Sequence, residues 1–349
     1  MITCLHLGAE QGRQGREPHF ACSHPKHPGT TPAGCLLCPD YCLPQKRTHP
    51  KQLILNRHGE FVDLSDLFGG AAAFAIFGGP SAREMPLQQL EKRGCLIFST
   101  NNCLANLPFP LRPHVWTHTD PTHKFHDAIW KDPAILKFTP EREWDSQTKE
   151  PRPGDKRKHK GVRTRAADGV LEFIPGQAAR YMPGVFGYKR NTTFRPAEWL
   201  WEDSINRGND KASFEAKNGW THTINTMFTV VRLAFYLGVK TLYLVGCDFH
   251  MSGERAYGFN QNKWRGGVES NNRYYFEMCL MFDALLPHFE AAGFQVFNCT
   301  PGSCLWSFPE LDFAEAVEQA TAGIEQELDC SQWYDSLTEE NHDDQPTDR

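Results

Sequence analysis

The stretch Ala71-Ala-Ala-Phe-Ala-Ile-Phe-Gly-Gly-Pro-Ser81 decides the fold of this chain. Its first seven residues form an apolar run, which is typical of a strand buried on both faces. The glycine pair Gly78-Gly79 ends the run, and a helical pattern with Leu87 and Leu90 follows. A second apolar run, Cys95–Phe98, completes a unit of strand, glycine turn, helix and strand.

The same alternation of strands and helices continues toward the C-terminus. It predicts an α/β fold with a mostly parallel sheet flanked by helices. Further strands are expected at His114–Thr117, Thr241–Val245 and Gln295–Asn298, and helices at Ile224–Leu237, Tyr274–Ala292 and Phe313–Leu328.

The composition is that of a globular protein. The 349 residues include 40% hydrophobic and 23% charged residues, which excludes a wholly disordered chain and a polytopic membrane protein. Because 37 basic residues face 42 acidic ones, a sequence-independent DNA coat is not favoured. An apolar stretch of about 18 residues and a basic-then-apolar N-terminal layout are both missing, so we expect a cytoplasmic protein without a membrane span.

The cysteines are concentrated at the N-terminus. Of the 12 in the chain, five lie within the first 42 residues, in a stretch without hydrophobic periodicity. This segregation predicts a metal module ahead of a reduced domain, and the C-x2-C knuckle supplies half of a tetrahedral zinc site. Four protein ligands would close the site and make the zinc structural, while an iron–sulfur cluster or no metal are the alternatives. The candidate ligands are Cys4, Cys22, His27, Cys35 and Cys38.

These patterns divide the chain into three parts. Residues 1–50 form the expected metal module, and residues 51–325 form the α/β domain. Residues 326–349 are rich in acidic side chains and are expected to be a disordered tail. Within the domain, the basic and apolar-poor segment 139–165 is expected to be a solvated loop or insertion.

The glycine turn is the first candidate binding element. Between a buried strand and a helix, Gly78 and Gly79 would let backbone N–H groups approach an anion at the helix N-terminus. Ser81 would cap the helix and donate its hydroxyl. The alternative is a tight turn that binds nothing, because the stretch is neither a G-x-G-x-x-G motif nor a P-loop.

Polar residues follow the other expected strands. Asn101, Asp120 and the run Cys247-Asp-Phe-His250 come after three of them. Since the carboxyl ends of parallel strands share one edge, these side chains would face one crevice. Asn101 could instead be a turn former, and Asp248 a carboxylate that caps a neighbouring loop. His250 suits a general acid, a base or a phosphate donor, although a lone histidine is more often structural.

Several short motifs also occur along the chain in the same order as in a known group of proteins. They are Phe77-Gly-Gly-Pro-Ser81, Thr223-Ile-Asn-Thr226, Leu237-Gly-Val-Lys-Thr-Leu-Tyr-Leu-Val-Gly-Cys-Asp-Phe249, Ala256-Tyr-Gly-Phe259 and Phe297-Asn-Cys-Thr-Pro-Gly-Ser303. Over residues 71–320 the chain resembles bacterial CMP-sialic-acid-dependent sialyltransferases and, more broadly, phage and bacterial glycosyltransferase-like and 6-hydroxymethylpterin diphosphokinase-like proteins. Cys38-Pro-Asp-Tyr41 resembles the end of the N-terminal Cys/His-rich segments of the phage and bacterial glycosyltransferase-like chains. The implied fold is a Rossmann-like variant of the GT-A type.

The resemblance implies roles for the matching residues. The turn Gly78-Gly79-Pro80-Ser81 would run along the phosphate and ribose of a nucleotide-sugar donor, with CMP as the favoured nucleotide. Asn101 and Asp120 would approach the nucleotide and the transferred group. Thr226 would sit at a helix start beside the donor, and Ser303 would line the base pocket.

The leaving group and the general base are also assigned by resemblance. Tyr257 matches a family tyrosine that donates to the leaving phosphate, and His250 replaces a second one, so no catalytic metal is expected. The family's histidine in a mobile lid has no counterpart at 268–272, which leaves Glu269 or His250 as the base. The loop Met251–Asn272 has the length and polarity of such a lid.

Three tryptophans and three basic residues have two readings each. An acceptor platform would explain the tryptophans, but core packing or a domain contact is favoured. Contacts with phosphate or a solvated surface would explain the basic residues of the loop. They are Trp199, Trp201 and Trp220, and Arg255, Lys263 and Arg265.

The sequence therefore predicts a glycosyltransferase that moves a sugar, sialic-acid-like for example, from a nucleotide sugar to a hydroxyl acceptor. One alternative is a Mg²⁺-dependent diphosphokinase acting on a pterin-like alcohol, with Asp120 and Asp248 as metal ligands. Another is a non-catalytic nucleotide- or nucleic-acid-binding protein that uses the Cys/His module and the basic residues of 149–165. Nucleic acid is the less favoured partner.

Overall fold

In a computed structural model of the chain, the apolar run at residues 71–77 forms strand β5 (Ala72–Ile76) near the middle of the main sheet. Its side chains alternate between two cores. Ala73 and Ala75 pack into one hydrophobic cluster, and Phe74 and Ile76 pack into another. The strand is therefore buried on both faces, which is what a continuous apolar run predicts.

The main sheet has nine strands in the order β15-β14-β5-β6-β7-β8-β11-β3-β4. The seven strands from β15 to β11 are parallel, β3 is antiparallel to β11, and β4 is antiparallel to β3. This confirms the predicted α/β fold with a mostly parallel sheet. The remaining strands are β3 (Ile54–Leu55), β4 (Phe61–Val62), β6 (Leu96–Thr100), β7 (Val115–Thr117), β8 (Leu136–Pro140), β11 (Val185–Tyr188), β14 (Thr241–Val245) and β15 (Gln295–Asn298).

The order of the strands reverses between β5 and β14. From β5 the chain moves outward through β6, β7 and β8, and it later returns to place β14 on the opposite side of β5. In open α/β sheets, ligands bind outside the carboxyl ends of the strands at such a switch point. The topology therefore points to the loops after β5, β6 and β14.

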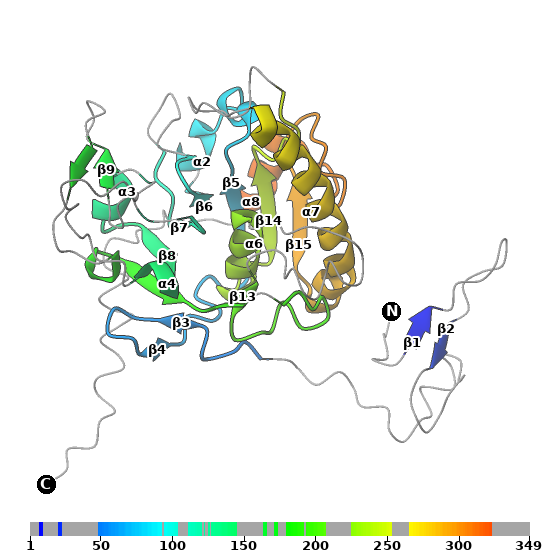
Figure 1. The fold of residues 1–349 in the computed structure, drawn as a ribbon. Coiled ribbons are helices and arrows are strands. Elements are labelled where there is room, and N and C mark those ends of the chain that lie inside the picture. The colour runs from blue at the N-terminus through cyan, green and yellow to red at the C-terminus, as the bar shows by residue number, and fades with distance from the viewer. Residues whose placement is uncertain are drawn as a thin grey trace, which may run out of the picture. The chain divides into compact units, whose positions relative to one another are not determined.

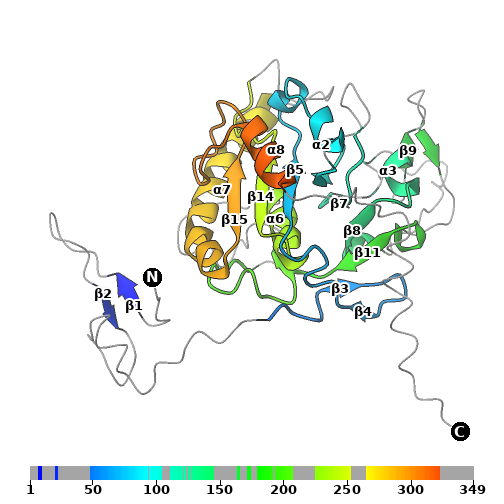
Figure 2. The same cartoon turned by 180° about the vertical axis from the view of Figure 1, so that it is seen from behind.

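Helices cover both faces of the sheet around this point. α6 (Thr226–Tyr236) and α7 (Arg265–Ala292) pack on the face that Ala73 and Ala75 share (Figure 1). The short helix η1 (Pro80–Arg83), α2 (Gln88–Lys92) and α8 (Phe313–Thr321) cover the other face (Figure 2). The other helices are α3 (Asp127–Lys131), α4 (Glu141–Trp144) and η4 (Ala179–Tyr181).

The chain divides into two units, Met1–His49 and Pro50–Arg349, and each is described by itself. In the first unit, β1 (Leu7–Ala9) pairs antiparallel with β2 (Phe20–Cys22). The second unit holds the main sheet and two small ones, β9 (Arg163–Arg165) with β10 (Leu171–Phe173) and β12 (Arg190–Asn191) with β13 (Ile205–Asn206).

The structure describes only part of the chain. None of the described helices is both long and apolar enough to cross a membrane. The segment 326–349, expected to be an acidic tail, lies outside the described residues. Those are residues 7–9, 20–22, 48–92, 94–103, 111–120, 122, 125, 127–144, 163–165, 171–173, 179–191, 193–206, 225–252 and 265–322.

The strands predicted from apolar runs are confirmed, and those at β14 and β15 have the predicted bounds. Two expectations about segments are wrong. Residues 139–144 are not part of a solvated loop or insertion, because β8 reaches Pro140 and is followed by α4, whereas residues 145–162 lie outside the described part of the chain. The helix expected at Tyr274 begins at Arg265, so the last part of the expected lid Met251–Asn272 is helical.

Strand β8 escaped sequence reasoning because it buries polar residues. Lys137 is fully buried, and its Nζ donates hydrogen bonds to the carbonyl oxygens of Asp132 (2.5 Å), Ile135 (2.9 Å) and Pro183 (2.7 Å). Burial lowers the pKa of Lys137 to about 7, against an opposing effect of the Asp132 carboxylate. The buried lysine satisfies carbonyl groups at one end of the sheet.

The lowered pKa of Lys137 predicts a pH dependence of stability. Between about pH 7 and 10 the unfolded chain holds a proton on this lysine that the folded chain has lost, so the free energy of unfolding should rise with pH in that window. Relative to Lys137→Met, the wild type should gain up to about 4 kcal/mol over those three pH units. Urea unfolding at several pH values measures the difference. Lys240→Met, at an exposed position, is the control, and parallel wild-type and Lys137→Met profiles would contradict the prediction.

Candidate functional site

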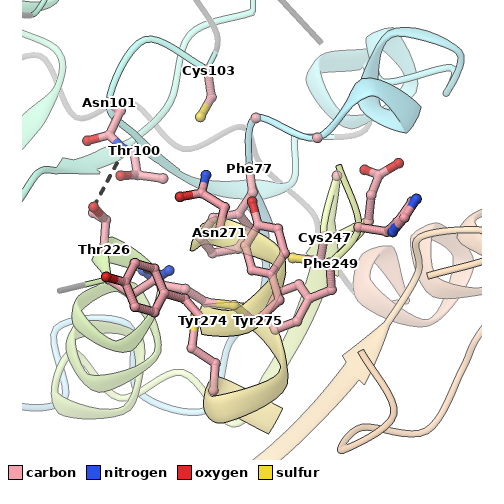
Figure 3. A pocket seen from close by; sticks show the side chains of 18 of the residues that line it. Phe77, Thr100, Asn101, Cys103, Thr226, Cys247, Phe249, Asn271, Tyr274 and Tyr275 are labelled. Atoms are coloured by element: carbon pink, nitrogen blue, oxygen red, sulfur yellow. Dashed lines mark hydrogen bonds between the residues drawn. The ribbon is translucent and has the colours of Figure 1, made fainter. Parts of the chain in front are cut away.

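A cavity of about 320 Å³ lies at the switch point of the sheet (Figure 3). The segments that follow β5, β6, β7 and β14 line it, together with the N-terminus of α6 and one side of α7. Its volume is at the lower end of the range for small-molecule sites. The structure brings eight of the predicted site residues to this cavity: Gly78, Gly79, Pro80, Asn101, Asp120, Thr226, Asp248 and His250.

Two glycines let the loops after β5 and β14 touch. The Gly79 N–H donates to the Gly246 carbonyl oxygen (2.9 Å), and the Phe77 N–H donates to that of Val245 (2.8 Å). A Cβ at Gly79 would overlap both the Gly246 carbonyl oxygen and the Asp248 carboxylate. Gly246 itself has a φ of 71°, a conformation that other residues rarely adopt.

Asp248 caps the glycine turn. Its Oδ1 accepts from the Ser81 N–H (3.3 Å), and its Oδ2 accepts from the Ser81 hydroxyl (2.7 Å). The alternative reading of Asp248, a carboxylate that caps a neighbouring loop, matches these contacts. The expected cap at Ser81 is wrong, because Gly79 is the N-cap residue of η1 and Ser81 lies inside that helix.

These contacts also bear on the prediction that the backbone N–H groups of the turn bind an anion. The N–H groups of Gly79 and Ser81 are bound within the protein, and Pro80 has none. The Asp248 carboxylate lies directly over the turn, where it would repel a phosphate. The turn therefore shapes the cavity, and the N–H groups of Gly79 and Ser81 are not available to an anion.

Polar side chains from β6, β7 and α6 form one wall of the cavity. Thr119 and Thr226 share a hydrogen bond between their hydroxyls (2.9 Å), and the Asn101 amide lies 3.5 Å from the Thr226 hydroxyl (Figure 3). Thr100 Oγ1 and Asn101 Oδ1 are buried and have no hydrogen-bond partner among the described residues. Atoms in this state can bond to a ligand or to water. Other buried atoms, such as Thr229 Oγ1, are in the same state away from the cavity, so it is the position of these two at the cavity that matters.

The N-terminus of α6 opens into the same wall. The Asn225 side chain caps the helix by accepting from the Met227 N–H (2.7 Å), and residues 225–227 all line the cavity. Helix N-termini present unpaired N–H groups and a partial positive charge. This end of the cavity therefore favours a negatively charged group of a ligand.

α7 supplies another part of the lining, which the sequence analysis did not predict. Its lining residues are Asn271, Tyr274, Tyr275 and Met278, and their spacing is that of one helical face. That spacing was the available signal, but the helix was expected to begin only at Tyr274. Asn272 ties the helix to the loop after β14, because its side chain accepts from the Met251 N–H (2.8 Å) and donates to the Met251 carbonyl (3.0 Å).

The thiols at the cavity are unsuited to nucleophilic chemistry. Cys103 and Cys247 line the cavity and are buried. Burial raises the pKa of Cys103 to about 12 and also raises that of Cys247 well above its usual value. Since only the thiolate is a strong nucleophile, both residues are neutral packing groups here.

The charges around the cavity are few. Asp120 and Asp248 are the acidic groups, and His250 is an exposed side chain at the rim. Among the described residues that line the cavity, none is a lysine or an arginine. A bound anion would therefore depend on neutral hydrogen-bond donors and on α6.

Other predicted residues do not line the cavity. Ser303 donates to the Cys247 carbonyl and accepts from the Leu305 N–H (3.0 Å), so its contacts hold a turn. Glu269 is exposed near the start of α7. Trp199 is buried against Phe228 and Phe289, so for this residue the core-packing interpretation is confirmed and a place in an acceptor platform is wrong.

Some predictions fall outside the described residues. They are Tyr257, Trp220, Arg255, Lys263 and four of the proposed metal ligands, Cys4, His27, Cys35 and Cys38. Cys22 lies in β2, opposite Leu7. The zinc module remains a prediction, and no group of metal-binding side chains was found within the described part of the chain.

No protein-family model matches the chain, and no curated protein or solved structure is significantly similar to it. The resemblance to sialyltransferases therefore stays a prediction. The site has to be interpreted from its own geometry.

The loop contact at Gly79 can be tested by a double-mutant cycle. Gly79→Ala should lower the free energy of unfolding by about 2 kcal/mol, because the added methyl overlaps Asp248 and the Gly246 carbonyl. Asp248→Ala should remove part of that penalty, giving a coupling energy of about 1 kcal/mol in denaturant unfolding. Gly59→Ala is the control. Its φ of 87° makes alanine costly there, but an added Cβ meets no atom within 4 Å, so its cost should not couple to Asp248→Ala. Equal coupling of Asp248→Ala to both alanine substitutions would refute the contact.

Proposed function

We propose that this protein is a glycosyltransferase that binds a nucleoside-monophosphate-linked sugar in the switch-point cavity and transfers the sugar to a hydroxyl acceptor. The observation that carries the proposal is the polar wall. It combines the N-terminus of α6 with two buried polar atoms that lack a partner, Thr100 Oγ1 and Asn101 Oδ1. On this proposal the sheet is a Rossmann-like variant of the GT-A fold.

The polar wall offers matched groups for a phosphosugar. The Thr100 hydroxyl can donate to an anionic oxygen, and α6 directs its partial positive charge to the same region. Asn101 Oδ1 can accept from a sugar or ribose hydroxyl. The anionic group is thus assigned to the α6 end of the cavity and not to the glycine turn, where Asp248 lies.

The charge balance favours one phosphate over two. A nucleoside diphosphate commonly needs Mg²⁺ or basic side chains to offset its charge. The described lining residues include two aspartates and neither lysine nor arginine. A monophosphate linked to a sugar carries less charge, which agrees with the CMP-linked donor that the resemblance implies.

The transfer would be a direct displacement. The acceptor hydroxyl oxygen would form a bond to the anomeric carbon, and the bond from that carbon to the phosphate oxygen would break, its electron pair leaving with the nucleotide. His250, at the rim of the cavity, would accept the proton of the hydroxyl or donate to the leaving phosphate. Glu269 is the weaker candidate for the base, because it is not among the residues that line the cavity.

The diphosphokinase alternative has less support. It needs carboxylates free to bind Mg²⁺, and the Asp248 carboxylate already accepts two hydrogen bonds from Ser81. Asp120 is exposed at another strand end. The nucleotide panel described next includes a result that would support this alternative.

A nucleotide panel tests the proposal. In the presence of EDTA, CMP should raise the melting temperature of the full chain, and it should do so more than UDP or GDP, because the cavity suits a single phosphate. The shift should vanish in Thr226→Val, which removes a hydroxyl from the polar wall. A shift that appears only with ATP and Mg²⁺ would support the diphosphokinase, and no shift with any nucleotide would overturn both enzymes.

His250 can be tested through turnover. Release of CMP from CMP-sialic acid should fall about a hundredfold or more in His250→Ala at saturating donor, while Kd for CMP changes little, if His250 transfers the proton. A large loss of CMP affinity in His250→Ala, restored in His250→Gln, would instead make His250 a phosphate donor. Undiminished turnover in both variants would exclude either role.

A further inference from the structure

Three aromatic side chains, from the loop after β14 and from α7, also line the cavity. The ring of Phe249, which follows β14, stacks on the ring of Tyr275 from α7, with centroids 4.9 Å apart and planes 28° apart. Tyr274 lies beside them, and all three line the cavity. In Figure 3 these rings gather around α7, and Thr100 and Asn101 lie above Thr226.

Phe249 has an unusual backbone for its residue type. Its φ is 53°, in the left-handed region. The other non-glycine residues with positive φ in the described chain are Asp66 and Asn101, whose types tolerate this region, whereas bulky residues seldom adopt it. Glycine or asparagine would occupy position 249 with less strain. The ring of Phe249 packs against the main hydrophobic core and also lines the cavity, so it has a role that this backbone does not require.

The lining of the cavity therefore combines two kinds of group. Hydroxyls, an amide and the N-terminus of α6 form one, and stacked aromatic rings form the other. A nucleotide has the same division, because its flat base is separated from its phosphate by the ribose. Aromatic side chains are common stacking partners of bases, since every base presents a π-face.

We propose that Phe249, Tyr274 and Tyr275 receive the nucleobase of the donor by stacking, while its phosphate lies at the α6 end of the cavity. This inference rests on the proposed function and adds the position and orientation of the nucleotide. It replaces Ser303, which does not line the cavity, as the expected base contact. Phe249 and Tyr275 then contribute affinity for the base, and the stack between them holds both rings in place.

Substitutions at Phe249 and Tyr275 can distinguish a loss of base stacking from a loss of folding. Phe249→Asn removes the ring but suits the left-handed backbone, so it should fold. Tyr275→Leu removes the second ring, and Tyr275→Phe keeps it. The control is Phe276→Leu on the same helix, because Phe276 is 56% exposed and contacts Trp306, outside the cavity. Circular dichroism and thermal melting establish that each variant is folded.

Calorimetric titration with CMP and with ribose 5-phosphate tests the inference. In the wild type, the base should make Kd for CMP at least about tenfold lower than Kd for ribose 5-phosphate. Phe249→Asn and Tyr275→Leu should lose that advantage while keeping their affinity for ribose 5-phosphate, and Tyr275→Phe and Phe276→Leu should resemble the wild type.

The outcomes distinguish this inference from the proposed function. Equal affinity of the wild type for CMP and ribose 5-phosphate would overturn the inference alone, and this comparison does not depend on the variants. Unchanged CMP affinity in folded Phe249→Asn and Tyr275→Leu would also overturn it alone. Failure of the wild type to bind CMP, UMP, AMP or GMP would overturn the proposed function, and the inference with it.

Discussion

The contact between the loops that follow β5 and β14 is the constraint on which the site depends. Gly79 donates to the Gly246 carbonyl at the point where the strand order of the sheet reverses. A Cβ at either glycine would overlap the other loop, so the approach requires both residues. Because the loops meet there, the segment 247–250 is held beside the glycine turn, and the cavity forms between them.

The same contact decides what the turn can bind. A backbone N–H that is already bonded within the protein cannot also hold a ligand. In the turn, the N–H groups of Gly79 and Ser81 are both bonded in this way. The Asp248 carboxylate adds a negative charge over the turn. The end of the cavity that favours an anion is therefore the N-terminus of α6, where Thr100 and Asn101 still have buried polar atoms without partners.

The position of α6 depends on buried contacts far from the cavity. The guanidinium of Arg232, fully buried on α6, donates to the carbonyl oxygens of Trp199 (3.0 Å) and Glu202 (2.8 Å). At the end of the helix, the Tyr236 hydroxyl accepts from the Leu64 N–H (3.1 Å). These bonds fix the helix axis, and the axis directs the N-terminus into the cavity. A polar wall of short side chains needs such support, because Thr226 can reach Thr119 only if the helix does not move.

The sequence by itself determined the α/β fold, the strands β5, β14 and β15 and most of the residues after their carboxyl ends, because apolar runs and glycine breaks are local signals. It could not reveal β8, whose buried Lys137 satisfies carbonyl groups contributed by other segments. Nor could it show that Asp248 binds Ser81, 167 residues away in the chain, or that Tyr275 stacks on Phe249. Those facts depend on distances between side chains on different elements. Only the packed sheet and helices set such distances, so the tertiary structure alone decided which polar groups of the site are free for a ligand.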